Sequence, residues 1–298
     1  MSSQSNPRVL VAFKKSRWEH FADGDLALEE GHDSNQASIE KLKRAHRIHR
    51  EGVEQVTGHL EKVGLDFESM YRGEVGETDA FDLIVTVGGD GTVLDLSHRV
   101  ATVPILAINS HPESSVGYFC AGTVTSFPDL LERSLEGSLQ SYSLARFSVR
   151  INGETRTPPV LNDVLVAHSN PAAVTHYELE IGRGPSEEQK SSGIWISTPA
   201  GSTAAIRSAG GFVLPLGCHC MEYLVREPYP MRDGNYRYRT GIEPMKRHFR
   251  ILSKMQHGRV FIDGPHIVHD LSFDDVVELD PDTAPLRIYG LDVDRRTR

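Results

Sequence analysis

A glycine-rich turn, Gly88-Gly89-Asp90-Gly91-Thr92, is the segment of this sequence best suited to chemistry. It follows an apolar run at residues 81–87 and precedes a helical pattern at residues 93–100. Glycines let a backbone approach a ligand closely, and the free N–H groups at the start of a helix suit phosphate. A carboxylate beside phosphate needs another task, and accepting a proton from an attacking hydroxyl is one. The sequence therefore predicts that Asp90 is catalytic; the alternative is a tight turn in which Asp90 caps the helix.

Two further segments offer groups that could hold a nucleotide. Asn162-Asp163 places an amide beside a carboxylate, which together supply donors and acceptors for a sugar diol. Taken alone, this pair is more simply an Asx turn. A Gly/Ser/Thr-rich loop at residues 198–205, with Ser208-Ala209-Gly210-Gly211 after it, could bind phosphate or a base edge through backbone groups. Taken alone, it is a flexible loop as often as a site.

In this order, the three segments resemble the signatures of the NAD kinase family. The turn at residues 87–94 is similar to the family's first signature. Diacylglycerol kinases, sphingosine kinases and phosphofructokinases share this signature more loosely. Residues 161–164 resemble its Asn-Glu/Asp pair, which holds the ribose hydroxyls and base of NAD, and residues 189–211 resemble its second signature. The resemblance implies the following nucleotide-binding residues: Gly88, Gly89, Gly91, Thr92, Asn109, Asn162, Asp163, Lys190, Ser192, Thr203, Ala204 and Ser208.

Two positions depart from the pattern of many bacterial members of that family. Ser192 stands where they have Asp, and Ala205 stands where they have Tyr. The first departure affects one ligand hydrogen bond, and the second affects the usual contact with the nicotinamide half of NAD. Four segments, at residues 14–18, 44–49, 190–193 and 225–228, are instead similar to the animal mitochondrial NAD kinase branch.

The activity that the resemblance implies is transfer of the terminal phosphoryl group of ATP, or of polyphosphate, to the adenosine-ribose 2′-hydroxyl of NAD, giving NADP. Phosphoryl transfer relies on positioning and charge stabilisation, so Mg²⁺ is expected on the donor. The donor carries several negative charges, which calls for cations nearby; the candidates are Lys14, Lys15, Arg17 and Arg226. Two alternatives stay open: another small-molecule or lipid kinase on this scaffold, because fold does not fix substrate, and an NAD-binding relative without catalysis.

The elements that must position these residues form two domains. Residues 1–137 alternate apolar runs with helical patterns, which predicts a doubly wound, Rossmann-like α/β domain with a parallel sheet. A polar stretch at residues 14–38 is predicted as a long loop. Strands are expected at 8–13, 65–71, 81–87 and 104–109, and helices at 39–63, 93–100 and 126–135.

Residues 138–298 change in texture to short strands separated by Gly, Pro and Asp turns, which predicts a mostly antiparallel β-sandwich domain of the NAD kinase type. The last residues are allowed to pack back on the first domain. Because the glycine turn and Asn162-Asp163 lie in different domains, we expect NAD to bind between them. Strands are expected at 144–152, 160–167, 177–181, 193–197, 250–253, 259–262, 276–279 and 285–288.

Composition limits the other function classes. The chain has 298 residues and a formal charge of -9, which argues against a nucleic-acid partner. It contains neither an apolar run long enough to span a membrane nor a secretory N-terminus, so a cytoplasmic protein with no membrane partner is expected. The turn is neither a Walker A loop nor a redox Rossmann motif. Relatives in the family are dimers or tetramers, so the resemblance implies a homodimer.

Cysteine and histidine residues give weaker signals. Three cysteines cannot build a disulfide framework, which favours a reducing compartment. Cys218-His219-Cys220 supplies too few ligands for zinc, so no metal site is predicted. His46 and His49 are expected as a surface pair on the long helix, with a phosphate contact as the alternative. Asp263-Gly264 is predicted as a hairpin turn.

Overall fold

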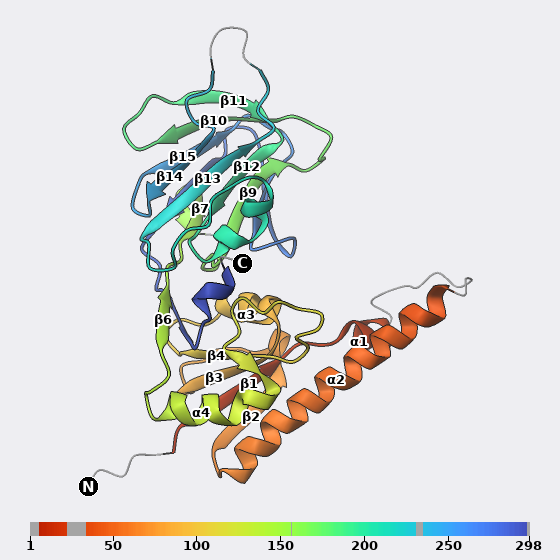
Figure 1. The fold of residues 1–298 in the computed structure, drawn as a ribbon. Coiled ribbons are helices and arrows are strands. Elements are labelled where there is room, and N and C mark those ends of the chain that lie inside the picture. The colour runs from red at the N-terminus through yellow and green to blue at the C-terminus, as the bar shows by residue number, and fades with distance from the viewer. Residues whose placement is uncertain (1–5, 23–33, 156, 231–234, 297–298) are drawn as a thin grey trace. The chain divides into compact units, whose positions relative to one another are not determined.

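A computed structural model describes residues 6–22, 34–155, 157–230 and 235–296, and the chain divides into two compact units (Figure 1). The first unit comprises the described part of Met1–Tyr142 together with Arg287–Arg296, and the second is Ser143–Leu286. The chain thus leaves the first unit after Tyr142, whereas the sequence placed the boundary at residue 137, and it returns to that unit at Arg287.

A seven-stranded sheet forms the centre of the first unit, in the order β2-β1-β3-β4-β19-β6, with β5 paired to β4. Pairing is parallel between β1 and β2, β1 and β3, β3 and β4, and β4 and β19. The strand expected at residues 285–288 thus pairs in the first sheet and not in the β-sandwich; the sequence expectation had allowed the last residues to pack back on the first domain. The bounds are β1 Arg8–Phe13, β2 Asp66–Tyr71, β3 Leu83–Gly88, β4 Ile105–Asn109, β5 Gly122–Thr123, β6 Ser141–Leu144 and β19 Leu286–Tyr289.

Helices α2 and α4 cover one face of this sheet with apolar side chains. Val56 and Leu60 of α2 are fully buried in a core cluster that includes Val9 of β1 and Val85 of β3. Residues of α4 belong to the same cluster. Gly64 follows α2 with φ +73°, a conformation that favours glycine as a helix terminator. Figure 1 shows α3 and α4 on opposite sides of the sheet. The bounds are α1 Arg17–Ala22, α2 Ser34–Lys62, α3 Asp90–Ser97 and α4 Phe127–Leu135.

Several boundaries differ from the sequence expectations in this unit, and those at α1, α2 and α3 affect the candidate site. The stretch at 14–38 is not all loop, since it contains α1 and the first turn of α2; residues 23–33 lie outside the described part of the chain. The helix expected at 93–100 begins at Asp90, with Gly89 at the N-cap position. Asp90 is therefore inside the first helical turn and does not cap it, which rules out the capping alternative.

Two six-stranded antiparallel sheets make up the second unit, in the orders β11-β10-β15-β18-β7-β8 and β14-β13-β12-β9-β16-β17. Buried side chains from both sheets form one core cluster, so the unit is a β-sandwich. The first sheet has β7 Ser148–Ile151, β8 Glu154–Thr155, β10 Thr175–Ile181, β11 Glu187–Ser191, β15 Phe249–Ser253 and β18 Val276–Asp280. The second has β9 Asp163–His168, β12 Gly193–Ser197, β13 Cys220–Arg226, β14 Thr240–Pro244, β16 Gly258–Ile262 and β17 Ile267–Leu271.

Sequence patterns missed several strands, mainly at sheet edges. Strands β11, β14 and β17 each end a sheet and carry polar residues, so they lack a continuous apolar run. Strand β13 lies inside its sheet, but Glu222 interrupts its apolar pattern although that side chain is fully buried. Short helical turns complete the fold: η1 Arg72–Glu74, η2 Val124–Ser126, η3 Gly201–Thr203, α5 Ala205–Ser208 and η4 Val293–Arg296.

Among the described residues, no helix is both long and apolar enough to cross a bilayer.

Candidate functional site

The carboxyl ends of β1 and β3 define the switch point of the first sheet. The connection after β1 leads to β2 on one side, and the connection after β3 leads to β4 on the other. Ligands of open α/β sheets bind where neighbouring connections diverge in this way. Lys14 follows β1 directly, and Gly89-Asp90 follows β3. The topology therefore assigns a cation and the predicted catalytic carboxylate to this ligand-binding edge.

Asp90 is half-buried, and a backbone group outside its own helix holds its carboxylate. The Phe119 N–H donates a hydrogen bond to Asp90 Oδ1 at 2.8 Å. Phe119 lies in the loop that joins β4 to β5. A carboxylate oriented by one N–H keeps its remaining lone pairs for a hydroxyl donor. This arrangement suits a group that orients a hydroxyl and accepts its proton.

The three glycines of the turn serve different purposes. A Cβ on Gly88 would lie 2.1 Å from Thr92 Oγ1, and one on Gly89 would lie 2.6 Å from Ser115 Oγ. Packing alone therefore demands these two glycines. A Cβ on Gly91 would meet only the Arg72 guanidinium, at 4.0 Å, and Gly91 is exposed. Internal packing does not explain Gly91, whereas close approach of a ligand would.

Asn109, at the end of β4, holds the loop that carries Phe119. Its amide Nδ2 donates to Ser115 O at 2.9 Å, and its Oδ1 accepts from the His111 N–H at 3.0 Å. The side chain is 4% exposed. Asn109 was predicted to bind the nucleotide; the structure engages both ends of its amide with the loop. Asn109 thus supports the loop at residues 111–115, and its contact with the nucleotide stays a prediction.

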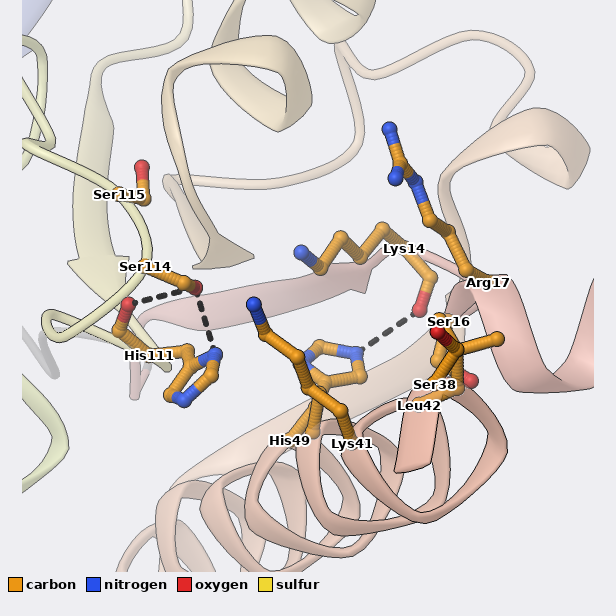
Figure 2. A pocket seen from close by; sticks show the side chains of 11 residues that line it. Lys14, Ser16, Arg17, Ser38, Lys41, Leu42, His49, His111, Ser114 and Ser115 are labelled. Carbon is orange, nitrogen blue, oxygen red and sulfur yellow. Dashed lines mark hydrogen bonds between the residues drawn. The ribbon is translucent and has the colours of Figure 1, made fainter. Parts of the chain in front are cut away.

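A cavity of about 630 Å³ lies between helix α2 and the carboxyl ends of β1 and β4 (Figure 2). Its lining includes Lys14, Arg17, Lys41 and His111, with Ser114 among the hydroxyl groups. Figure 2 shows the ammonium groups of Lys14 and Lys41 pointing into the same space. Burial, and then the charges of Arg72 and Arg17, lower the pKa of Lys14. Cations crowded in this way favour an anionic occupant.

His49 joins three elements at the base of this cavity. It is 2% exposed, so the expectation of a surface pair is wrong for this residue. Burial lowers its pKa to about 4, and the ring is neutral at pH 7. Nε2 lies 2.8 Å from the Lys14 carbonyl oxygen, which can only accept, so Nε2 carries the proton and Nδ1 accepts from Ser110 Oγ at 2.9 Å. The ring thus ties α2 to the ends of β1 and β4.

Two of the predicted donor-site cations, Lys15 and Arg226, are not among the lining residues of this cavity. The Lys15 ammonium lies over the Tyr71 ring, 5.4 Å from its centroid, and Lys15 is not part of the cavity lining. Arg226 ends β13 in the second unit, where its Nε lies 3.9 Å from Glu227 Oε2. Lys41 of α2 was not among the predicted cations, yet it lines the cavity.

In the second unit, Asp263 positions the Asn162-Asp163 pair. Its carboxylate accepts hydrogen bonds from the backbone N–H groups of Leu161, Asn162 and Asp163, at 2.9, 2.7 and 3.0 Å. Asp263 is thus more than the hairpin residue that the sequence predicted, although its φ of 50° does suit a turn. Only a carboxylate presents two acceptors to three converging N–H groups without adding a donor. The spacing of about a hundred residues hid this contact from sequence reasoning.

The second signature packs directly on this pair. The Thr198 N–H donates to Asn162 O at 2.9 Å, and the Thr198 hydroxyl donates to Leu161 O. A Cβ on Gly201 would lie 2.0 Å from Asn162 O, so only glycine lets η3 approach this backbone. The Ala205 N–H donates to the Asp163 carboxylate at the start of α5. The structure therefore brings Asn162, Asp163 and the 198–205 loop together.

The other predicted binding residues are distributed around this cluster. Thr203 and Ala204 lie in η3 and at its end, and both are half-buried. Ser208 is exposed at the end of α5. Ser192 precedes β12 and donates its N–H to Arg226 O at 2.9 Å. Lys190 is exposed on β11, an edge strand of the other sheet.

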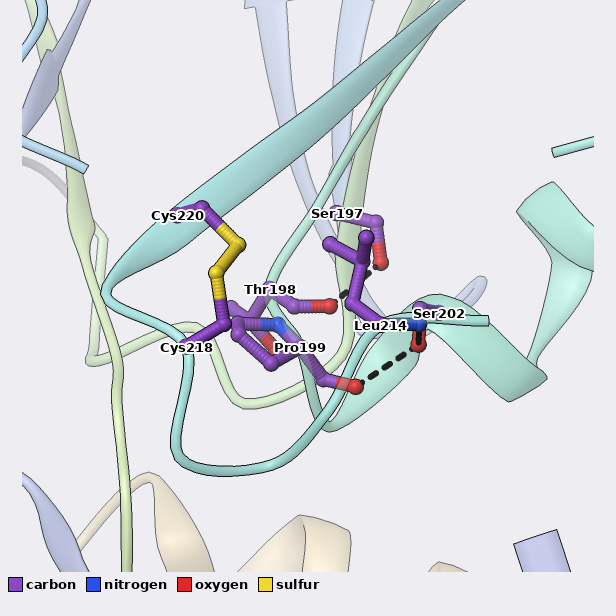
Figure 3. The surroundings of a disulfide bond; sticks show 7 residues. All are labelled: Ser197, Thr198, Pro199, Ser202, Leu214, Cys218 and Cys220. Carbon is purple, nitrogen blue, oxygen red and sulfur yellow. Dashed lines mark hydrogen bonds between the residues drawn. A yellow bond between two sulfur atoms is a disulfide. The ribbon is translucent and has the colours of Figure 1, made fainter. Parts of the chain in front are cut away.

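The loop after the second signature is fastened at several points (Figure 3). Ser202 Oγ donates to Pro199 O at 2.8 Å and accepts from the Leu214 N–H at 2.9 Å. Cys218 and Cys220 form a disulfide at the start of β13, which corrects the expectation that the cysteines stay reduced. Cys120 is a free, buried thiol. No group of three or more potential metal ligands occurs in the part of the chain that the structure describes.

Comparison with known proteins identifies the family. The ATP-NAD kinase N-terminal domain model matches residues 29–138, and the C-terminal domain model matches residues 161–217. A protein of Oryza sativa subsp. japonica named probable NADH kinase is 32% identical over 277 residues, 86% of this chain and 85% of that protein. The NADH kinase of Arabidopsis thaliana is 30% identical, over 86% of this chain and 87% of its own.

Solved structures agree on the fold. The Archaeoglobus fulgidus NAD kinase in complex with ATP gives a TM-score of 0.66 at 20% identity, covering 97% of this chain and 95% of its own. Yeast NADH kinase complexed with NADH gives a TM-score of 0.70 at 16% identity, covering 98% and 86%. The chain therefore belongs to the NAD kinase family, and its α/β domain with an antiparallel β-domain is that family's fold. The similarity to the animal mitochondrial branch stays a prediction.

Asp163 should make stability depend on pH. Burial, and then the charge of Asp263, raise the pKa of Asp163 to about 7. Below pH 7 the folded carboxyl gains a proton that the unfolded chain does not bind until about pH 4, so this residue favours folding as the pH falls. Replacing Asp163 with Asn removes that dependence. We expect Asp163→Asn to raise the free energy of unfolding by about 2–3 kcal/mol more at pH 8 than at pH 5.

Urea unfolding at the two pH values measures the difference. Asp270→Asn is the matched control, since that side chain is 84% exposed and paired with Arg259 on the same sheet. A gain from Asp163→Asn that is equal at both pH values would contradict the raised pKa.

Proposed function

We propose that this chain transfers the terminal phosphoryl group of ATP to the adenosine-ribose 2′-hydroxyl of NAD, with Asp90 as the proton acceptor. The observation that carries the proposal is the Asp90 carboxylate, held by the Phe119 N–H beside the switch point of the sheet. A ribose hydroxyl is a very weak acid, so a carboxylate accepts its proton only as the O–P bond forms. Asp90 would orient the hydroxyl for in-line attack and take its proton in that step.

Replacing Asp90 with Asn tests this role. Asn keeps the shape and the bond to Phe119 but loses the charge and the basicity. We expect Asp90→Asn to lower kcat by about 10²–10⁴-fold, while the affinity for NAD changes far less, because the group acts mainly in the transition state. Formation of NADP from NAD and MgATP gives kcat, and calorimetric titration gives affinity. A kcat within a few-fold of the wild type would remove Asp90 from the mechanism.

The acceptor side of the proposal rests on the Asn162-Asp163 cluster. The Asn162 Oδ1 atom is buried and has no hydrogen-bond partner among the described residues, so it can accept from a ribose hydroxyl or a base amine. Asp163 is 5% exposed and adjoins it. Relatives of this chain include plant NADH kinases and archaeal NAD kinases, so NAD and NADH should be compared as acceptors. NAD is the acceptor we propose.

A substitution at Gly91 tests whether this glycine is needed for packing or for the approach of a ligand. It lies in the first turn of α3, so alanine there should stabilise the helix by about 0.5–1 kcal/mol. If the nucleotide approaches this backbone, the same methyl group obstructs it. We expect Gly91→Ala to unfold at or above the wild-type temperature and to raise the KM for a nucleotide substrate at least about tenfold.

Gly88→Ala is the contrasting variant, because its Cβ meets Thr92 and should lower stability by about 1–3 kcal/mol. Thermal melts and initial rates on both variants distinguish the two roles. A Gly91→Ala enzyme with unchanged KM values would place the ligand elsewhere.

We further propose that the donor phosphates bind in the cavity lined by Lys14, Arg17 and Lys41. The crowded cations, the neighbouring hydroxyl of Ser114 and the position beside β1 support this assignment. Mg²⁺ would enter as part of the MgATP substrate, bound largely through the phosphates, as is usual for this ion. Arg17 is exposed and would contact the outer part of the donor.

Lys14 and Lys41 should therefore control donor binding. Each charge-assisted hydrogen bond lost corresponds to about 10–100-fold in affinity. We expect Lys14→Met with Lys41→Met to raise the KM for ATP at least about tenfold and to leave the KM for NAD within about threefold. Lys15→Met is the matched control, because Lys15 lies over Tyr71 outside the cavity. A larger effect on the KM for NAD than for ATP would contradict the donor assignment.

The homodimer and the cytoplasmic location stay proposals that rest on the sequence. Light scattering at working concentration measures the oligomeric state.

A further inference from the structure

Arg295, in η4, clamps the turn that carries Phe119. One of its guanidinium nitrogens, Nη1, donates to Gly117 O and also to Cys120 O, the latter at 3.3 Å. The same two residues close the turn through the Cys120 N–H, which donates to Gly117 O at 3.1 Å. Gly117 has φ +68°, and a Cβ there would lie 2.7 Å from Asn109 Nδ2. Arg295 therefore fixes both carbonyl ends of one tight turn.

The clamped turn ends at the catalytic carboxylate. Phe119 lies inside the turn, and its N–H is the donor to Asp90 Oδ1 at 2.8 Å. Asn109 secures the start of the same loop through His111 and Ser115. Arg295 holds the carbonyl groups of the segment from Gly117 to Cys120, and Asp90 accepts the N–H of Phe119 within it. Arg295 thus contacts Gly117 and Cys120, and Phe119 between them contacts Asp90, which connects η4 to that carboxylate.

The Cys120 thiol, in the clamped turn, is near both Asp90 and Arg295. Cys120 is 1% exposed, and burial, followed by the negative charge of Asp90, raises its pKa to about 12, while Arg295 acts in the opposite direction. The thiol therefore experiences both charges. Asp292, at the start of the same turn of chain, holds Arg295 in place, since its Oδ2 lies 3.6 Å from Arg295 Nε.

We propose that Arg295 is a positioning residue for phosphoryl transfer: by clamping the Gly117–Cys120 turn, it aims the Phe119 N–H that orients Asp90. This inference rests on the proposed role of Asp90. The chain places Arg295 nearly two hundred residues from Gly117, and β19 brings η4 to this unit by pairing with β4. Misplacement of a reacting group by about 1 Å can cost about 10²-fold in rate.

The test measures kcat and both KM values for Arg295→Ala. The expected result is a kcat lower by about 10–100-fold, with the KM values for NAD and ATP within about threefold of wild type. Millimolar guanidinium chloride should restore part of the lost rate in this variant but not in the wild type, with sodium chloride as the salt control. Arg133→Ala is the matched control. Arg133 Nη1 lies 3.4 Å from Asp129 Oδ2 on the surface of α4, so this substitution should leave kcat unchanged.

A second readout follows the turn itself. Cys120 is the free buried cysteine, so a maleimide reagent should label it slowly in the wild type. A loosened turn exposes this thiol, and Arg295→Ala should label Cys120 at least about tenfold faster, as measured by mass spectrometry of the labelled peptide. Arg295→Gln keeps one donor and should shift both readouts in the same direction by less; it decides the question if the alanine variant does not fold.

Separate outcomes identify which claim fails. If Asp90→Asn is inactive while Arg295→Ala and Arg295→Gln keep wild-type kcat and Cys120 labelling, Arg295 has no positioning role and the kinase mechanism stands. If the two KM values rise as much as kcat falls, without guanidinium rescue, the effect of Arg295 is general destabilisation and the inference is overturned. If Asp90→Asn keeps its activity, the proposed mechanism fails first. In the double variant Asp90→Asn with Arg295→Ala, the losses should not add, because Arg295 acts through Asp90.

Discussion

A hydrogen bond between the Phe119 N–H and the Asp90 carboxylate joins the two segments of the first unit that the proposed chemistry requires. One is the glycine turn that leaves β3, and the other is the loop that leaves β4. Strand pairing between β3 and β4 sets the distance between them, because Gly88 is in register with Asn109. Helix α3 can begin at Asp90 only because the glycines before it pack against Thr92 and Ser115. The Asp90 carboxylate is thus held by the sheet and by a partner on a neighbouring connection.

In the second unit, too, a carboxylate accepts backbone N–H groups and so fixes a loop. Asp263 accepts three backbone N–H groups and so fixes the Leu161–Asp163 segment, on which Thr198 and Gly201 pack. This arrangement makes ionisation of Asp163 unfavourable. Burial of Asp163, and then the charge of Asp263, raise its pKa to about 7. Strained electrostatics of this kind are common where a protein orients groups for a ligand. The buried Asn162 Oδ1 beside them agrees with that interpretation.

A neutral histidine, His49, holds the backbone of Lys14 at the edge of the cavity. His49 binds the Lys14 carbonyl and the Ser110 hydroxyl, which connects the segments that follow β1 and β4. The Ser110 N–H in turn donates to Gly88 O at 2.9 Å. Because burial keeps the ring uncharged at neutral pH, His49 adds no further positive charge to a cavity that already holds Lys14 and Lys41. The cavity and the glycine turn are therefore parts of one hydrogen-bonded framework.

The sequence by itself determined the nature of both domains, since apolar runs such as those of β1 and β3 form buried parallel strands whatever surrounds them. It also determined the family, because three glycine-rich and polar segments occur in a fixed order around Asp90, Asn162 and Gly201. Edge strands such as β11 and the start of α3 were missed, because polar strands carry no period and a helix start depends on its neighbours. Only the tertiary structure decided that Asp263 holds Asn162, that His49 is buried and that Arg295 reaches Gly117. The reason is that each of these contacts joins residues far apart in the chain, and local sequence patterns carry no information about such partners.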